Sequence, residues 1–233
     1  PRTVHDDVTR AGIGDDYARL LLRDGGSGDT GAAKSVNVAA GVCCDSGYMG
    51  LRLDIVRLYN SIRIGGYMPW AAVDTIVMPD DDERRMKKLL RKLAGICAEY
   101  RVDIITGHTE VNNAVSEPVI SVTMMGRHAG QGEDMQDVHG YQMTTGHGVA
   151  GTRGLKCPAG MDIVMCGQTG VGGTLQLYYD NQKELFERYS ESYLRPVEQL
   201  KQLILLGGQV DIALDHDCIY SHDISRGGVF AAL

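Results

Sequence analysis

The chain has 233 residues, a formal net charge of −7, 43% hydrophobic residues and 23% charged residues. This length suits one large domain or two modest ones, and the composition is that of a globular protein and not of a disordered or fibrous one. The acidic balance argues against nucleic acid or a membrane surface as partner. No apolar run reaches the roughly 18 residues that a membrane span needs.

Six cysteines lack the C-x-x-C spacing of a metal site and lie mostly in apolar runs, so we expect reduced, buried thiols. The chain begins at Pro1 with no charged-then-apolar leader behind it, so we expect any targeting segment to be absent or already removed. Together these observations predict a cytoplasmic protein.

Hydrophobic periodicity predicts most elements in chain order. Predicted strands cover 36–44, 102–106, 119–125, 161–166, 210–214 and 218–221, and predicted helices cover 51–64, 86–97, 185–194 and 197–206. Residues 126–156 are rich in Gly, His, Gln and Asp with little periodicity, which predicts a long loop and a domain boundary. We therefore expect one domain over 1–150 and a second over 151–233.

The end of the chain combines an acidic residue, a glycine pair and the start of an apolar helix. Asp223 follows a predicted strand, Gly227 and Gly228 permit a tight turn, and an apolar run continues to Leu233. Backbone N–H groups at a helix start attract phosphate, and a carboxylate holds a cation. The helix would stop after one turn, so we expect the second domain to be incomplete in this chain.

Three earlier segments place polar side chains in glycine-rich turns or at strand ends: 12–16, 44–46 and 107–110. Carboxylates gathered from separate strand ends are what a magnesium–nucleotide site needs, whereas each segment taken singly is ordinary turn or cap chemistry. His108, beside Glu110, would bind a phosphate or metal, or simply hydrogen-bond across a turn.

Two glycine-rich segments offer weaker alternatives. Residues 28–35 approach a phosphate-binding P-loop through Lys34 and Ser35, but Ala33 replaces its second glycine and a strand is predicted where a helix must follow. Residues 170–174 either cradle a phosphate or allow close packing. We expect a loop for the first segment and packing for the second.

In this order, the clusters resemble the superfamily of aminoimidazole ribonucleotide synthetase, thiamine-monophosphate kinase, selenophosphate synthetase and a hydrogenase maturation factor. Residues 12–16 resemble its Gly-Asp-Asp segment, and Asp45-Ser46 its Thr-Asp-Ser turn. Asn60 before Gly65-Gly66 resembles its Asn-Asp helix. Residues 106–110 resemble its Gly-Asp-Thr turn, and residues 222–233 its Asp-Val-Thr-x-Gly-Gly motif.

The resemblance implies a fold of α/β plus α+β class, with an N-terminal barrel-like domain that forms a homodimer and a C-terminal α+β domain. It implies ATP and Mg²⁺ as cofactors and phosphate transfer to a carbonyl, amide or similar oxygen of a small-molecule or protein-terminal substrate. The roles it implies are metal binding by Asp15, Asp16 and Asp45, catalysis by His108 and Glu110, and nucleotide binding by Asn60, Gly107, Thr109, Asp223, Gly227 and Gly228.

Two positions depart from the family pattern. Ser61 replaces a second metal-binding Asp, and His108 replaces Asp or Glu. Losing two carboxylates weakens the electrostatic hold on a magnesium–nucleotide complex, although Glu110 compensates in part. A noncatalytic, dimeric nucleotide-binding scaffold or sensor is therefore the alternative function.

Overall fold

The computed structural model of the chain describes residues 8–10, 16–22, 34–43, 47–127, 160–216, 218, 220–225 and 227–232. Its centre is a six-stranded sheet with the order β1-β2-β3-β6-β4-β5. The strands are β1 (Val8–Arg10), β2 (Ala18–Leu22), β3 (Lys34–Cys43), β4 (Met68–Met78), β5 (Asp103–Val111) and β6 (Val119–Arg127). Neighbouring strands are antiparallel except β4 and β5, which are parallel and joined through a helix.

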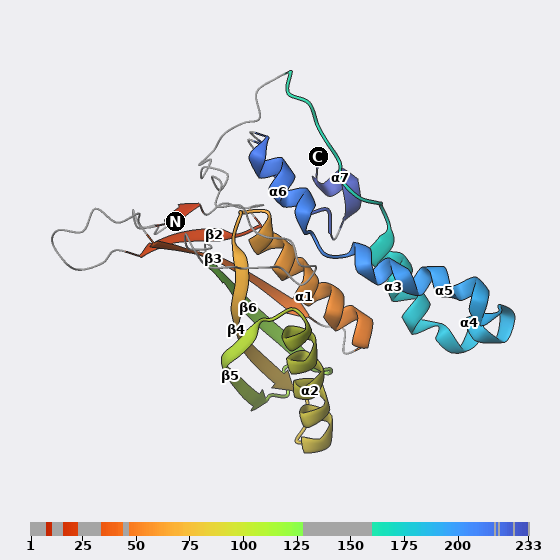
Figure 1. Cartoon of the computed structure of the whole chain (residues 1–233). Coiled ribbons are helices and arrows are strands. Elements are labelled where there is room, and N and C mark those ends of the chain that lie inside the picture. Colours follow the sequence, from red (N-terminus) through yellow and green to blue (C-terminus); the bar gives the residue numbers. More distant parts are fainter. Residues whose placement is uncertain are drawn as a thin grey trace.

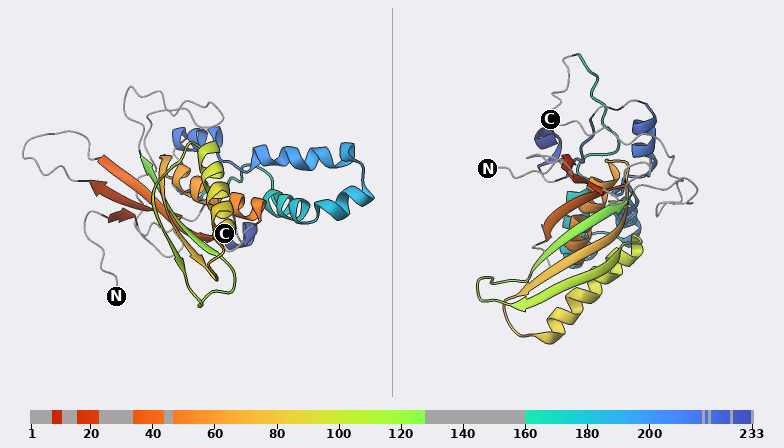
Figure 2. Two further views of the ribbon diagram at one scale, coloured as in Figure 1. Left: turned by 90° about the horizontal axis from the view of Figure 1, so that it is seen from below. Right: turned by 90° about the vertical axis from the view of Figure 1, so that its left-hand side faces the viewer.

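Two helices cover one face of this sheet (Figure 1). Helix α1 (Tyr48–Arg63) contacts β3, β6 and β4, and helix α2 (Glu83–Glu99) contacts β5. The residues of β6 alternate, so that Ile120, Val122 and Met124 are buried beneath the helices. This alternation follows from the two-residue side-chain period of a strand. Within the described part of the chain, no helix covers the opposite face of the sheet (Figures 1 and 2).

The remaining helices follow residue 159. They are α3 (Val171–Asp180), α4 (Gln182–Arg188), α5 (Glu191–Gln199), the 3₁₀ helix η1 (Leu200–Leu203), α6 (Gly208–Asp215) and α7 (Gly228–Ala232). Helices α3 to α5 form an arm that packs on α1 through α3 and extends sideways from the sheet (Figure 2). None of the helices within the described ranges is long and apolar enough to cross a bilayer.

In the first half of the chain, the sequence predicts two helices and three strands and misses β1, β2 and β4. The helices predicted over 51–64 and 86–97 are α1 and α2, and the strands predicted over 36–44, 102–106 and 119–125 are β3, β5 and β6. Because β3 starts at Lys34, a strand follows 28–35, so the P-loop alternative lacks the helix that it requires. The mixed α/β character is confirmed, whereas the barrel and the two-domain division stay predictions.

Three predictions in the second half are wrong. Residues 161–166 form no strand, and their apolar side chains are exposed, with Ile163 at 78% and Val164 at 80%. Residues 210–214 lie inside helix α6. The described residues of 218–221 are also not in a strand. A short apolar run does not distinguish a strand from a helix, and a strand forms only where a neighbour pairs with it.

Helix boundaries in the arm also differ from the prediction. The helix predicted over 185–194 is divided between α4 and α5, because the chain is extended at Tyr189 and Ser190. Helix α5 ends at Gln199 and continues as η1, so 197–206 is not one helix. Helix α3 begins at Val171, inside the glycine-rich segment 170–174, for which no helix was predicted.

Candidate functional site

The segment near the chain's end folds back onto the start of the sheet domain. His222 Nδ1 lies 2.7 Å from Asp16 Oδ2, and the Ser221 hydroxyl donates to the Ile64 carbonyl over 3.0 Å. The side chains of His222 and Asp16 are 26% and 12% exposed. Two polar clusters far apart in the sequence therefore meet beside the C-terminal end of α1.

Asp223 is the buried acid of this site, with a relative exposure of 8%. Burial, followed by the nearby charge of Asp16, raises the pKa of Asp223 to about 6, while His222, Arg57 and a hydrogen bond with Asn60 act in the opposite direction. A desolvated carboxylate beside another carboxylate is disfavoured as an anion. A bound cation would relieve this repulsion.

Asn60 anchors the segment between η1 and α6 to α1. Its side-chain amide donates to the Ile204 carbonyl and accepts from the Leu206 N–H, each over 3.0 Å. Asn60 is buried because α1 packs on the sheet along most of its length. The residue therefore fixes the segment that precedes α6 and also contacts Asp223.

Gly227 and Gly228 form the turn into α7. Their φ angles are +89° and +65°, in the left-handed region that side chains other than glycine rarely adopt. The Gly228 N–H donates to the Ser225 carbonyl over 3.1 Å. The predicted tight turn after Asp223 is thus present, with the glycines required by backbone geometry.

The predicted catalytic pair lies elsewhere on the sheet. His108 Nε2 and Glu110 Oε2 are 3.5 Å apart on β5, with side chains 66% and 45% exposed. His108 pairs with Thr75 of β4, whereas Arg57, at the edge of the Asp16–Asp223 site, contacts Gly41 of β3 on the opposite face of the sheet. In the strand order β3-β6-β4-β5, three spacings of about 4.8 Å separate β3 from β5 by roughly 14 Å.

Gly107 and Thr109 lie on the other face of β5 from His108 and Glu110. Gly107 pairs with Asp74 of β4, and a Cβ atom at position 107 would lie 2.4 Å from Asp74 Oδ1. Asp74 is buried, and this burial raises its pKa. The buried Asp74 side chain therefore leaves no room for a side chain at position 107.

Asp15 and Asp45 lie outside the described residues. Across the ranges that the structure describes, no group of three or more His, Cys, Asp and Glu side chains is placed to hold a metal. Mg²⁺ in nucleotide sites uses one or two carboxylates and completes its shell with phosphate oxygens and water. The pair Asp16 and Asp223 meets this smaller requirement, since both acids lie close together and Asp223 is desolvated.

The sequence prediction assigns no role at this site to Arg57, Ser221 or His222. It also does not predict the contact between His222 and Asp16. The one available signal is the spacing of Arg57, which lies three residues before Asn60 and therefore on the same side of the helix. Contacts across more than 200 residues, such as Asp16 with His222, have no periodic signal.

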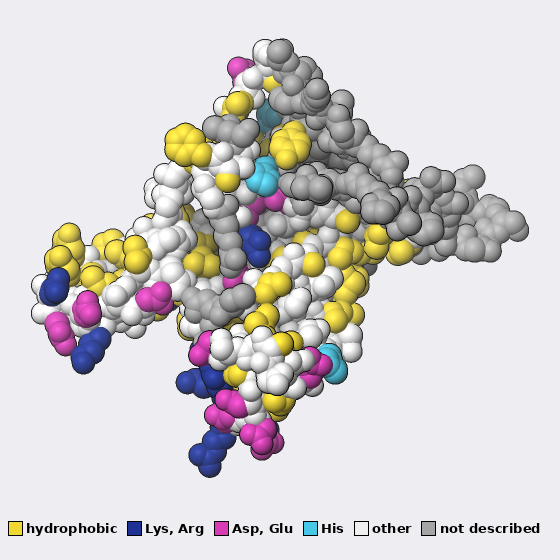
Figure 3. All heavy atoms as spheres, turned by 180° about the vertical axis from the view of Figure 1, so that it is seen from behind, with side chains coloured by type: hydrophobic (Ala, Val, Ile, Leu, Met, Phe, Trp, Pro, Cys, Tyr) yellow, Lys and Arg dark blue, Asp and Glu magenta, His cyan; other side chains and the backbone are white. Residues whose placement is uncertain are grey.

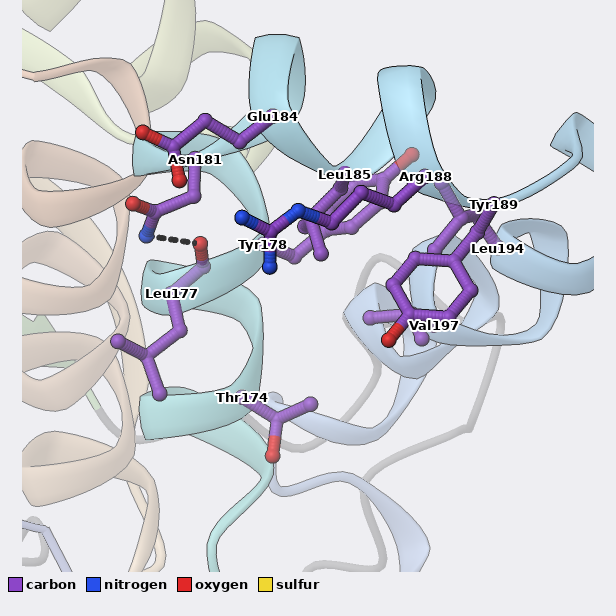
Figure 4. A pocket seen from close by; sticks show the side chains of 10 residues that line it. All are labelled: Thr174, Leu177, Tyr178, Asn181, Glu184, Leu185, Arg188, Tyr189, Leu194 and Val197. Atoms are coloured by element: carbon purple, nitrogen blue, oxygen red, sulfur yellow. Dashed lines mark hydrogen bonds between the residues drawn. The ribbon is translucent and has the colours of Figure 1, made fainter.

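A separate cavity of about 430 Å³ lies in the arm, between α3, α4 and α5 (Figure 4). Its lining is Thr174, Leu177, Tyr178, Asn181, Glu184, Leu185, Arg188, Tyr189, Leu194 and Val197. The Asn181 amide donates to the Leu177 carbonyl over 2.8 Å, which uses one of its polar atoms. No predicted site residue lines this cavity, so it is distinct from the Asp16–Asp223 site.

Comparison with known proteins identifies a family over part of the chain. Residues 28–128 match the family model described as AIR synthase related protein, N-terminal domain. No curated protein shows significant similarity to the chain.

Among solved structures, similarity extends to the HypE–HypF complex, with 16% identity, a TM-score of 0.37 and coverage of 41% of this chain and 34% of that one. The thiamine monophosphate kinase of Aquifex aeolicus matches with 14% identity, a TM-score of 0.35 and coverage of 40% and 34%. Thermotoga maritima PurL complexed with ATP matches with 16% identity, a TM-score of 0.42 and coverage of 52% and 21%.

The matched parts span about a third or less of those solved chains. The family match rests on the sequence of residues 28–128, which includes Asn60 and the segment 107–110. The resemblance to the aminoimidazole ribonucleotide synthetase superfamily that the motifs predict is therefore confirmed, through a match of residues 28–128 to the N-terminal domain of the AIR synthase related family.

Proposed function

We propose that this protein binds ATP with Mg²⁺ at the site formed by Asp16, Asn60, His222 and Asp223, and uses it in phosphoryl transfer. The observation that carries the proposal is the contact between Asp16 and His222, beside the buried carboxylate of Asp223. It joins two segments that resemble nucleotide-site motifs of one superfamily. The family match over 28–128, which contains Asn60, supports ATP use in general.

The chemistry needs positioning and charge neutralisation more than covalent catalysis. When bound, Mg²⁺ would neutralise charge on the phosphates. Asp16 and Asp223 would hold the cation, and His222 would keep the Asp16 carboxylate in place through their 2.7 Å contact. The acceptor would be a carbonyl, amide or similar oxygen that becomes a leaving group once it is phosphorylated.

One observation favours the alternative of nucleotide binding without turnover. His108 and Glu110 lie on the exposed part of β5, away from Asp223. The Ser61 hydroxyl, at the position of a family metal ligand, donates to the Arg57 carbonyl over 2.9 Å within the helix. A catalytic role for His108 and Glu110 at this site therefore requires a second copy of the chain.

We further propose a homodimer formed through the uncovered face of the sheet. Leu20, Leu22 and Val42 are 36%, 48% and 45% exposed, and their strand positions place them on the face opposite α1. Figure 3 views the molecule from this side and shows apolar side chains along it. A contiguous apolar face of this kind is typical of an interface.

Isothermal titration calorimetry with ATP and MgCl₂ tests nucleotide binding, with Asp223→Asn as the site variant. Asp103→Asn removes the same charge from an exposed position on β5 and is the matched control. We expect binding by the wild type and the control, and a loss of at least about tenfold in affinity for Asp223→Asn. Absence of wild-type binding would overturn the proposal.

A phosphate-release assay then separates the two functions. Turnover of bound ATP with a carbonyl or amide acceptor supports phosphoryl transfer. Binding without release of phosphate across a panel of such acceptors supports the sensor or scaffold.

A further inference from the structure

Arg57 lies at the edge of the Asp16–Asp223 site and has no role in the function described so far. It is on α1, one turn before Asn60, so that both residues lie on the same side of the helix. Its guanidinium contacts β3 closely, since a Cβ atom on Gly41 would lie 2.7 Å from Arg57 Nη2. The side chain is 27% exposed and is therefore within reach of a ligand.

The guanidinium of Arg57 is poorly paired within the described part of the chain. Its Nε is buried without a hydrogen-bond partner there, and Nη2 is 3.8 Å from Asp54 Oδ1, beyond hydrogen-bonding distance. A buried N–H that gives up water without gaining an acceptor destabilises the folded state. An unpartnered N–H of this kind is tolerated when other interactions of the folded protein, or a bound ligand, offset its energetic cost.

The other two arginines of α1 are bonded to carboxylates and are only 5% and 0% exposed, although each also has a buried nitrogen without a hydrogen-bond partner among the described residues. Arg52 binds both carboxylate oxygens of Glu99, each at 2.6 Å, and Arg63 binds both oxygens of Asp211, at 3.1 and 3.3 Å. Both join α1 to a neighbouring helix. Arg57 has only the longer ion pair with Asp54 and no hydrogen bond to a carboxylate among the described residues, so its exposed N–H groups can still bind a ligand.

The charge around Arg57 suits one class of ligand. Arg57 lies one turn before Asn60, which hydrogen-bonds Asp223, so the guanidinium lies on the same side of the helix as the site. The site therefore combines two carboxylates, which attract a cation, with a guanidinium, whose planar N–H fork matches phosphate oxygens. A magnesium-bound nucleoside polyphosphate carries both complementary charges.

We propose that Arg57 binds a phosphate group of the nucleotide and thereby selects nucleoside di- and triphosphates over nucleosides. The inference rests on the proposed ATP site and adds the group that recognises phosphate. Its contribution increases with the number of phosphates on the ligand and is absent for adenosine. Lysine at this position would keep the charge but lose the fork.

The test measures affinities for adenosine, ADP–Mg²⁺ and ATP–Mg²⁺ by calorimetry in the wild type, Arg57→Gln and Arg57→Lys. Arg84→Gln is the matched control, because it removes the same charge from an exposed position on α2. We expect Arg57→Gln to weaken ATP binding about tenfold or more, Arg57→Lys to weaken it less, and adenosine affinity to be unchanged. Thermal unfolding without nucleotide shows whether each variant is folded.

The outcomes separate this inference from the proposed function. If the wild type binds no ATP–Mg²⁺, the ATP site itself is refuted. If the wild type binds ATP–Mg²⁺ and folded Arg57→Gln binds it equally well, the ATP site stands and the role of Arg57 is refuted. An equal loss of affinity for adenosine and ATP would also refute phosphate recognition, since it would indicate a change in the shape of the site.

Discussion

The imidazole of His222 lies 2.7 Å from the carboxylate of Asp16, a residue 206 positions earlier in the chain. This contact, with the hydrogen bond from Ser221 to Ile64, holds the segment 220–225 against the end of α1. It also brings Asp223 to its buried position. The local stability of this segment should therefore depend on the Asp16–His222 pair.

We expect His222→Gln to destabilise the fold by about 1 kcal/mol, because the 2.7 Å contact is partly buried and one partner is lost. Urea unfolding measures this difference. His108→Gln is the control, since it removes an exposed pair with a longer separation of 3.5 Å, and should change stability by less than about 0.5 kcal/mol. Equal effects of the two substitutions would contradict the assignment.

The raised pKa of Asp223 predicts a pH-dependent stability in metal-free buffer. Burial and the charge of Asp16 raise this pKa from 3.8 to about 6, so the folded state holds the proton more tightly than the unfolded state. The contribution to stability is therefore present below pH 3.8 and is lost as the pH rises through about 6. Over this interval, the loss amounts to at most about 3 kcal/mol.

Asp223→Asn removes this titration. We expect the stability of the variant relative to the wild type to increase between about pH 4 and about pH 7, as measured by urea unfolding in the presence of EDTA. ATP–Mg²⁺ affinity of the wild type should show the opposite trend and rise with pH, since the carboxylate form binds the cation. A stability difference between variant and wild type that is constant with pH would contradict the raised pKa of Asp223.

The fold is predictable from sequence where one residue pattern decides the structure. Helices α1 and α2 have apolar residues at intervals of three and four, and they form as predicted. The sequence pattern predicts no strand over β4, because Trp70, Ala71 and Ala72 interrupt the alternation of apolar and polar residues. Both faces of this part of the strand are buried, and that burial results from tertiary packing. The strand predicted over 161–166 does not form, because no strand of the described structure pairs with this exposed segment.

The candidate site is predictable to a similar extent. The order of the motifs predicts that Asp16 and Asp223 share a site, and the structure brings them together. The same order also groups His108 with them, but the strand order and register place His108 on the edge strand β5, on the sheet face opposite α1. Register depends on pairing between strands, which a single sequence does not specify for a mixed sheet.

Gly107 provides a test of structural against nucleotide-binding roles. A methyl group at position 107 would lie 2.4 Å from Asp74 Oδ1, which is backed by a buried core. We therefore expect Gly107→Ala to destabilise the protein by about 1–3 kcal/mol through overpacking. Thr109→Ala, two residues away on the same face of exposed β5, is the control and should have a smaller effect on stability.

Thermal and urea unfolding of the two variants give the comparison. Gly107→Ala with wild-type stability but weakened ATP binding would contradict the packing role and restore Gly107 to the nucleotide site.

The uncovered sheet face makes a direct prediction about assembly. Val42 is 45% exposed on β3 and pairs with Ser121 of β6 on that face. If a second copy covers it, Val42→Arg would bury an unpaired charge in the interface and should convert the dimer into a monomer of 25.3 kDa. Leu177→Arg places the same charge on the arm, at a side chain 67% exposed, and should leave the dimer intact. Light scattering coupled to size-exclusion chromatography measures both masses, and a monomeric wild type or a dimeric Val42→Arg variant would show that this face is not the interface.

Because His108 and Glu110 share that face with Val42, loss of the dimer should also remove any ATP turnover to which they contribute. ATP binding by Asp16 and Asp223 within one chain should persist.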